Sequence, residues 1–498
     1  MISTPVTGLQ ANHQKYFQGL IVLVLLTAIA TRLWQLGLGR SLWHDEALLA
    51  LNIVQRSWFE LFNPLDGNQV APPLFLLMAK FMTTIFGESD ISLRLIPCFA
   101  GCLSVYFIWE SSRRLFSGPS ALFATVLIGF CGTTIYYSGE LKQYSTDLLA
   151  SSILMMAAPI LNLEKRSHFA MILLLCMVLP WLSHPALFVI PGFFLFIFGP
   201  AFYQDFRKPV TRFGFAVMMF ITSILVHFIW ILRHTSQNQY LNKFWAENFL
   251  PLNRALPGWL IDKLNEFHTG VLGVPIFFTL ITLTSLAVLI FGGKVRLLLL
   301  TLTPVVLMLM ACACKIYPVT GRFLLFLLPS YALILAGALE TVLSSHRRNK
   351  FKFVLGSVAG SALILFVLFG AWVISSNPIA HEDIKPLMIR LSHEAMPDDF
   401  VYVYYGALPA FDYYCRQYRL PTSKIIRGIS ARDRESLYAA EIRSLPEGRI
   451  WYLFSHIKST PTMDEGRLFL DAIEKRGSFI DDQASHNTVL LLYKNKPL

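Results

Sequence analysis

Residues 352–375, KFVLGSVAGSALILFVLFGAWVIS, form an apolar run with one charged side chain, at its first position. A helix needs about 20 apolar residues to cross a bilayer, so this stretch predicts a transmembrane helix. Charge is distributed very differently on its two sides. The first 375 residues hold 26 Lys and Arg against 15 Asp and Glu, whereas the last 123 hold 16 of each kind. The sequence therefore predicts a membrane domain, residues 1–376, followed by a soluble domain, residues 377–498.

The composition of the whole chain excludes an ordinary soluble protein. Of its 498 residues, 55% are hydrophobic and 15% are charged, whereas soluble proteins carry about 25% charged residues. The net charge of +11 lies entirely in the membrane domain. We therefore interpret it as a topology signal, and we expect no nucleic-acid partner. The seven cysteines show neither a disulfide framework nor zinc-binding spacing.

Ten further apolar runs precede residues 352–375, and one more run, 71–87, is ambiguous. The ten lie at residues 18–36, 92–110, 119–138, 145–161, 168–183, 185–203, 211–232, 271–292, 295–314 and 322–342. Basic residues collect in the cytoplasmic connectors of membrane proteins. If 71–87 only dips into the outer interface, fourteen basic residues, Arg113 and Arg114 among them, fall on the cytoplasmic side. We therefore expect about eleven transmembrane helices, and up to thirteen, in the cell membrane, with a cytoplasmic N-terminus.

This topology places three long segments outside the membrane: a first outer loop, 37–91, a long outer loop, 233–270, and the tail, 377–498. In the tail, alternating patterns predict strands at 400–406, 449–455 and 488–494, with helices at 408–418 and 463–476. The fold class is thus an α-helical polytopic membrane protein with a C-terminal extracytoplasmic α/β domain. Since the tail shows no phosphate-binding loop and no nucleophile motif, we expect it to bind or support, not to catalyse.

The first chemical candidate is the acidic pair in SLWHDEALLALN, residues 41–52. Asp45 and Glu46 stand beside His44 in a loop against the outer leaflet, where adjacent carboxylates could act as a general base or bind a cation. The alternative is structural, because an aspartate before an apolar helical run can simply cap the helix.

The second candidate is YYSGELKQYSTDLLAS, residues 136–151, at the outer rim of two apolar helices. It contains Glu140, Lys142, Tyr144 and Asp147, and ionisable groups at that depth are costly unless they are paired or face a polar cavity. An ion pair of Lys142 with Glu140 or Asp147 is one reading. Three basic residues, Lys142, Arg94 and Arg322, lie at the outer ends of apolar runs. Each could be an anchor whose charged end snorkels to the membrane interface. Together they could instead bind the phosphate of a lipid carrier.

These motifs resemble the lipid-carrier-dependent glycosyltransferases of the C-type membrane fold. The resemblance is to the family 39 group, which includes protein O-mannosyltransferases and the aminoarabinose transferase of lipid A. The motifs occur in order over nearly all of the first 350 residues: the acidic pair Asp45-Glu46, the APPL segment 71–74, Arg94, Asp147, and YPVTGRFLL at 317–325. The chain departs from the family at Ala71, where members often have Lys or His.

The resemblance implies a role for each matched residue. Asp45 would be the catalytic base that deprotonates an acceptor hydroxyl, which attacks a polyprenyl-phosphate sugar with inversion. Glu46 would position the acceptor or a divalent metal, and Arg94 would support the first loop or the phosphate. Lys142 or Arg322 would replace the cation missing at position 71. The acceptor would be a glycan, a glycolipid or a protein.

Two other classes of function compete with transfer. A membrane transporter or flippase also has many spans, but transporters usually show internal repeats and charged or broken helices near the midplane. Here the ionisable groups crowd the outer rim and no repeat is visible. A non-catalytic envelope scaffold that uses the tail for binding is the third class.

Overall fold

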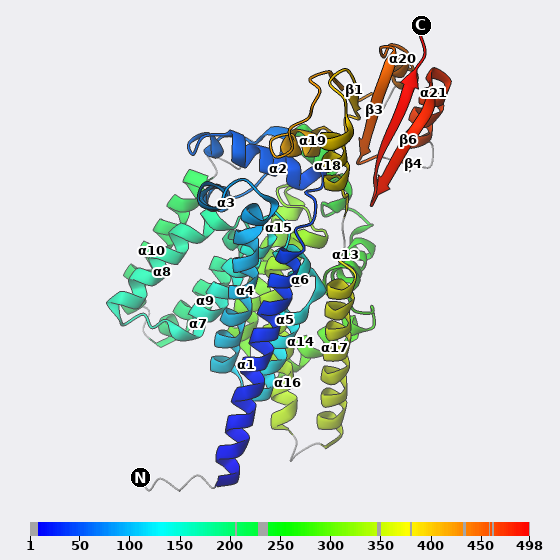
Figure 1. Cartoon of the computed structure of the whole chain (residues 1–498). Helices are drawn as coiled ribbons and strands as arrows, with labels where there is room; N and C mark the ends of the chain where they lie inside the picture. Colours follow the sequence, from blue (N-terminus) through cyan, green and yellow to red (C-terminus); the bar gives the residue numbers. More distant parts are fainter. Residues whose placement is uncertain are drawn as a thin grey trace.

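The computed structural model describes residues 8–204, 207–227, 238–345, 350–378, 381–431, 435–457, 459–460 and 463–497. Figure 1 shows a bundle of helices with the start of α1 at one end and a small sheet domain at the other. Before the tail, the helices are α1 (Gly8–Gly37), α2 (His44–Gln55), α3 (Pro73–Phe86), α4 (Asp90–Leu115), α5 (Gly118–Phe130), α6 (Gly132–Ser138), α7 (Tyr144–Ile160), α8 (Arg166–Leu182), α9 (Ala186–Gln204), α10 (Arg207–His227), α12 (Gln239–Phe244), α13 (Leu256–Glu266), α14 (Phe278–Phe291), α15 (Val295–Ala313), α16 (Leu328–Ser344) and α17 (Lys350–Ser376). Short turns of helix lie at η1 (Glu60–Phe62), η2 (Asp66–Asn68), η4 (Ala246–Asn248), η5 (Phe267–Val271) and η6 (Gly321–Leu327).

The helices confirm a polytopic membrane protein. Among the described residues, seven helices are long and apolar enough to cross a membrane, and the bent pair α5 and α6 makes eight. The predicted spans 145–161 and 168–183 are helices of 17 residues, and 271–292 holds a helix of 14. The end of the predicted span 211–232 lies outside the described residues. Length and composition alone therefore support fewer crossings than the eleven expected.

The predicted span 119–138 is broken, with a bend of 51° between α5 and α6 at Cys131. A break leaves backbone carbonyls of the first helix without helical partners. The guanidinium of Arg32, fully buried in α1, donates to the carbonyls of Gly129 at 2.8 Å and Ile128 at 3.1 Å. The Thr134 hydroxyl also donates to Ile128 O, at 2.8 Å. A buried arginine thus satisfies the carbonyl groups that the break exposes.

The predicted span 271–292 starts late because the chain cannot continue as a helix before it. The π-helix η5 ends at Val271, Gly273 then takes a φ of 68°, and Pro275 follows. A left-handed glycine followed by proline is a typical helix stop. The predicted loop 233–270, in turn, contains α12 and α13 where it is described.

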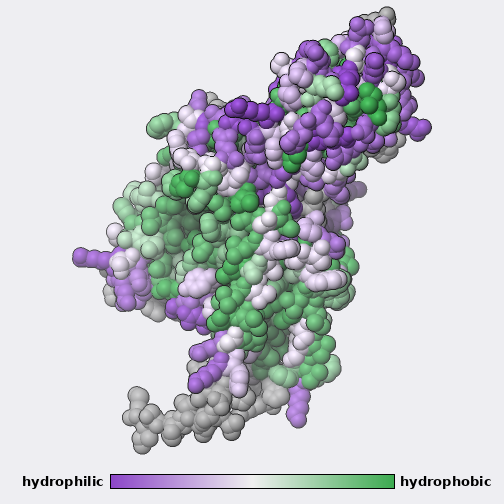
Figure 2. Space-filling model, in the orientation of Figure 1, coloured by the Kyte–Doolittle hydropathy of each residue, from purple (hydrophilic) through white to green (hydrophobic). Residues whose placement is uncertain are grey.

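The surface supports a membrane-embedded bundle. Figure 2 shows a hydrophobic band across the visible face of the helices, with hydrophilic residues at both ends and over the tail. Helix α3, within the ambiguous run 71–87, has 14 residues and is therefore about 21 Å long, shorter than the roughly 30 Å hydrocarbon core. It lies beside α2 at the end of the bundle that carries the tail (Figure 1).

We therefore expect a reporter fused after Gly87 to lie on the same side of the membrane as a reporter fused after Leu498. A reporter fused after Arg114, at the far end of α4, should lie on the opposite side. Reporters that are active on one side only measure this directly in cells. A Gly87 fusion on the side opposite to the Leu498 fusion would contradict this placement of α3.

The tail is an α/β domain, as the sequence predicts. Its sheet has the order β2-β1-β3-β7-β6, with β1 parallel to β2 and β3, and β7 antiparallel to β3 and β6. The predicted strands correspond to β1 (Phe400–Val403), β3 (Gly448–Ser455) and β7 (Thr488–Asn495). The other elements are β2 (Ile425–Arg427), β4 (Ser459–Thr460), β5 (Met463–Asp464), β6 (Gly477–Ser485), α18 (Lys385–Glu394), α19 (Leu408–Tyr414), α20 (Glu435–Arg443) and α21 (Glu465–Arg476).

The two faces of this sheet belong to different hydrophobic cores, because successive strand residues point to opposite faces. Tyr402 and Tyr452 pack into a core with residues of α20 and α21. Val401 and Trp451 pack into a second core that also holds Leu49 of α2, together with α3, α18 and α19 residues. The first loop and the tail therefore share one continuous core.

Candidate active site

The acidic pair of the first loop lies in the first turn of α2. Negative charge is favoured there by the helix dipole. Trp43 occupies the N-cap position, so Asp45 does not cap this helix. The two carboxylates differ in exposure: the side chain of Asp45 is 26% exposed, whereas that of Glu46 is 2% exposed. Asp45 is thus the member of the pair that a substrate can reach.

Two basic side chains from distant parts of the chain meet at Asp45. Arg322 Nη2 lies 3.3 Å from Asp45 Oδ2, and Lys142 Nζ lies 4.0 Å from the same oxygen. Lys142 also donates to Gln69 Oε1 at 2.8 Å. The structure therefore brings together Asp45 and two of the three cations that the sequence singled out.

The cations control the ionisation of Asp45. Burial alone would raise the pKa of Asp45, but Lys142 and Arg322 outweigh it and hold the pKa below its usual value. Asp45 is therefore a carboxylate at neutral pH. Burial lowers the pKa of Lys142, and Asp45 opposes that shift. With Lys142 protonated, the three side chains carry one excess positive charge, which suits an anionic ligand.

Arg322 lies among aromatic rings. Its guanidinium carbon is 5.6 Å from the ring centroid of Tyr144 and 6.0 Å from those of Trp43 and Phe323. Aromatic faces attract a cation at these distances. Tyr144, predicted as a supporting residue, thus contributes to the site by holding Arg322 beside Asp45.

The turn before Arg322 is fixed by Glu266 at the end of α13, a residue that no sequence motif singles out. Glu266 Oε1 accepts hydrogen bonds from the Thr320 hydroxyl at 2.5 Å and from the Gly321 amide at 2.8 Å. Lys263 donates to its other oxygen at 2.8 Å. The long loop 233–270 therefore helps to place Arg322.

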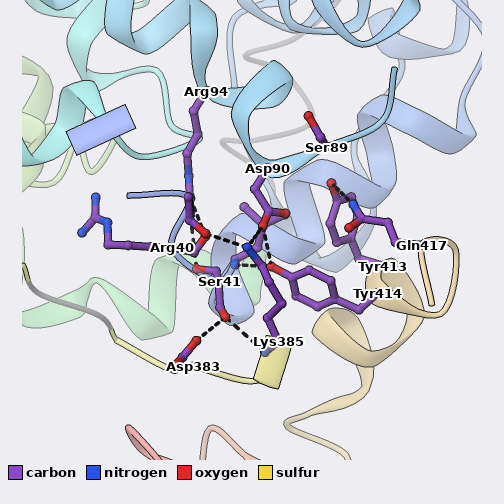
Figure 3. A network of polar contacts seen from close by, with 12 residues as sticks. Arg40, Ser41, Ser89, Asp90, Arg94, Asp383, Lys385, Tyr413, Tyr414 and Gln417 are labelled. Carbon is purple, nitrogen blue, oxygen red and sulfur yellow. Dashed lines mark hydrogen bonds and ion pairs between the residues drawn. The ribbon is translucent and has the colours of Figure 1, made fainter. Parts of the chain in front are cut away.

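Glu46 and Arg94 bind each other and lie apart from this cluster. Arg94 donates to Glu46 at 2.9 and 2.6 Å, and to the carbonyls of Arg40 at 2.6 Å and Ser41 at 3.2 Å. The Leu141 amide also donates to Glu46, at 2.5 Å. Figure 3 shows Arg94 pointing toward the segment of Arg40 and Ser41. This geometry does not support a catalytic Glu46 or a phosphate-binding Arg94; the pair ties α4 and the 139–143 connector to the first loop.

Glu140 and Asp147 take buried, supporting positions. Glu140 accepts a hydrogen bond from Trp43 Nε1 at 2.9 Å, and burial together with Glu46 raises the pKa of Glu140 to about 7. Asp147 is buried in α7. Within the described residues, the ion pair of Lys142 is with Asp45, so the alternative pairing with Glu140 or Asp147 is wrong.

Histidines do not form a metal centre in the described part of the chain. His44 faces the tail, where its Nδ1 lies 2.9 Å from Gly406 O. His268 is buried, with its ring nitrogens 2.8 Å from Leu264 O and 2.9 Å from the Thr282 hydroxyl. No three described His, Cys, Asp or Glu side chains are grouped to hold a metal ion.

A surface pocket adjoins the cluster. Gln69, the partner of Lys142, is part of its wall, and so is Ala71. The remaining wall is formed by Leu61, Phe62, Asn63, Pro64, Leu65, Asn68, Val70, Pro73, Leu76, Asn238 and Leu241. The pocket therefore joins the first loop to the beginning of the long loop, one hydrogen bond away from Lys142.

Comparison with known proteins shows which family model and which solved structures this chain resembles. A family model described as dolichyl-phosphate-mannose-protein mannosyltransferase matches residues 70–230. No curated protein matches the chain. The overall fold matches the folds of ArnT and of an archaeal oligosaccharyltransferase, and together with the family model it confirms the resemblance to protein O-mannosyltransferases and to ArnT.

Among particular proteins, ArnT from Cupriavidus metallidurans bound to undecaprenyl phosphate superposes with a TM-score of 0.53 at 10% identity, over 95% of this chain and 98% of that chain. Its apo structure gives a TM-score of 0.52 at 10% identity over the same shares. The apo oligosaccharyltransferase of Archaeoglobus fulgidus gives 0.51 at 13% identity, over 96% of this chain and 74% of that chain. At these identities the likeness establishes the fold.

Proposed function

We propose that this chain is a membrane glycosyltransferase that moves a sugar from a polyprenyl-phosphate donor to an acceptor hydroxyl on the outer face of the membrane. One observation carries the proposal: a partly exposed carboxylate, Asp45, shares a site with two cations, Arg322 and Lys142. The class of the fold and the undecaprenyl phosphate bound by the similar ArnT structure support this choice of donor.

The chemistry follows from these charges. Asp45 accepts the proton of the acceptor hydroxyl, and the hydroxyl oxygen attacks the anomeric carbon from the face opposite the phosphate. The bond between that carbon and the phosphate oxygen breaks, and its electron pair stays on the phosphate. Arg322 and Lys142 stabilise the charge that develops there. The products are an inverted glycoside, a polyprenyl phosphate and a protonated Asp45 that returns its proton to water.

Each substrate class has a place in this proposal. The donor sugar is a hexose or a pentose, and the acceptor is a glycan, a glycolipid or a protein. Lys142 replaces the cation that the family often has at position 71, because its partner Gln69 lies two residues from Ala71 in the wall of the same pocket.

Mass spectrometry of envelope glycans tests the proposed function in cells. Cells with the wild-type gene should contain a glycan, glycolipid or glycoprotein with one hexose or pentose more than cells that carry Asp45→Asn. Identical glycans in the two strains would contradict the proposal. Uptake or lipid translocation in vesicles that depends on the chain, with unchanged glycans, would instead identify a transporter or flippase.

The cation cluster also predicts a change in pH dependence. A general base must be deprotonated, and Lys142 lowers the pKa of Asp45, so the wild-type enzyme should keep its base active well below neutral pH. Lys142→Met raises the pKa of Asp45 and should move the acid limb of kcat/KM to higher pH. Lys15→Met, at the opposite end of α1, is the control that should leave the limb in place. If the acid limb of kcat/KM for Lys142→Met coincides with that of the wild-type enzyme, the limb does not report the titration of Asp45.

A further inference from the structure

The helix that presents Asp45 is capped by a residue of the tail. The first amide groups of a helix have no partner within the helix, and Trp43, at the N-cap position of α2, provides no side-chain cap. Glu382, between α17 and α18, fills this role: its Oε2 accepts a hydrogen bond from the His44 amide at 3.0 Å. A carboxylate at this end of a helix also interacts favourably with the helix dipole.

Glu382 is itself held by the end of strand β3. The Ser455 hydroxyl donates to Glu382 Oε2 at 3.1 Å, and His456 Nδ1 lies 2.6 Å from Oε1. The residue is 6% exposed, so its carboxylate is fixed and shielded from water. The position of the cap therefore depends on the folded sheet of the tail.

Two further contacts lock the same turn of α2. The His44 ring stacks on the His456 ring, with centroids 4.2 Å apart and an interplanar angle of 12°. Burial and His456 lower the pKa of His44, which keeps the ring neutral, and its Nδ1–H donates to the Gly406 carbonyl at 2.9 Å. Three separate tail segments thus contact the residue that immediately precedes Asp45.

A second network anchors the tail to the membrane domain independently of Glu382. Figure 3 shows Lys385, Asp90, Tyr414, Ser41 and Asp383 within it. Lys385 Nζ lies 2.5 Å from Asp90 Oδ2, the Tyr414 hydroxyl donates to Asp90 at 3.2 Å, and the Ser41 hydroxyl donates to Asp383 at 2.5 Å. The shared hydrophobic core adds to this attachment. Loss of the Glu382 side chain should therefore loosen the start of α2 while the tail stays docked.

We infer that Glu382 is a positioning residue: it acts through the His44 amide to fix the backbone from which Asp45 reaches Arg322 and Lys142. The tail thereby takes part in the reaction without touching the substrate. This inference rests on the proposed function for its kinetic consequence, whereas the capping contact itself is tested without any activity.

Hydrogen exchange and kinetics on the full-length protein in detergent test the inference together. Glu382→Ala should increase amide exchange in the first turn of α2 and leave exchange in α19 unchanged. It should lower kcat about tenfold, because a change far from the chemistry that misplaces a catalytic group can cost up to about 10²-fold in rate, and KM values should stay within twofold of wild type. Glu382→Gln keeps an oxygen that accepts from the His44 amide and should recover most of kcat. The matched control is Glu394→Ala, which removes a half-exposed tail carboxylate and should change neither measurement.

Several results would overturn the inference. If amide exchange in α2 of Glu382→Ala equals that of the wild-type protein, Glu382 does not cap the helix. If the alanine and glutamine variants lose kcat equally, a hydrogen-bond acceptor at this position does not rescue activity. If Glu382→Ala does not fold, Ser455→Ala, which removes one partner of Glu382, should show the same exchange pattern more weakly, and unchanged exchange there would contradict the inference. If Glu382→Ala increases amide exchange in α2 but the wild-type protein transfers no sugar, the proposed function is contradicted and the capping contact is not.

Discussion

Asp45→Asn is expected to reduce sugar transfer by about 10²- to 10⁴-fold, the range that general-base catalysis contributes. Asparagine keeps the size of the side chain and can still accept a hydrogen bond from Arg322, but it cannot take the acceptor's proton. The site also loses the negative charge that competes with a phosphate for the two cations. Binding of undecaprenyl phosphate to Asp45→Asn should therefore equal or exceed binding to the wild-type protein.

The measurement is single-turnover transfer and undecaprenyl phosphate binding with purified protein in detergent. Asp66→Asn is the matched control, because Asp66 lies in the same loop and is 82% exposed, and it should behave as wild type in both assays. Near-normal turnover of Asp45→Asn would refute its assignment as the base. Loss of both turnover and binding, in a protein that elutes as wild type, would make Asp45 a residue of the donor site instead.

Arg322→Gln should weaken binding of undecaprenyl phosphate by about 10- to 100-fold, since a hydrogen bond to a charged group contributes about 1.5–3 kcal/mol. Lys142→Gln should weaken binding as well. We expect the double variant to lose less than the product of the two single effects, because both cations face one phosphate. Equilibrium titration with undecaprenyl phosphate in detergent micelles measures all three variants.

Two controls separate this effect from general loss of positive charge. Arg254→Gln removes an exposed arginine of the long loop and should leave the affinity unchanged. Arg94→Gln, which breaks the buried pair with Glu46, should lower thermal stability; its guanidinium does not reach the cluster. Tight binding by the Arg322 and Lys142 double variant would refute the phosphate site.

Sequence patterns could identify the individual residues of the site but not all of their pairings. Asp45, Lys142 and Arg322 were each singled out by charge at the rim of an apolar run, and the structure brings them together. The partner of Arg94 could not be chosen, because several carboxylates share that rim and the distances between helices are not encoded in spacing. Glu382 and Glu266 carry no motif; their roles arise when distant segments meet.

The limits of the fold prediction have similar causes. The predicted span 119–138 reads as a continuous apolar run, yet it bends where Arg32 of another helix supplies hydrogen bonds. Strand β6, GSFIDDQAS, was missed because it is an edge strand whose residues are mostly exposed, so it lacks the alternation of a half-buried strand. The bend in 119–138 and the formation of strand β6 both depend on contacts with distant segments, which a local sequence pattern does not contain.

The core shared by the first loop and the tail has a consequence for biosynthesis. The loop's apolar residues, such as Leu49 and Phe75, leave the ribosome more than 300 residues before Trp451, which packs in the same core. During that interval, the apolar face of the loop lacks its final cover. The core and the Glu382 contact with α2 are therefore complete only after the tail has folded, and a nascent chain halted before residue 377 would lack both.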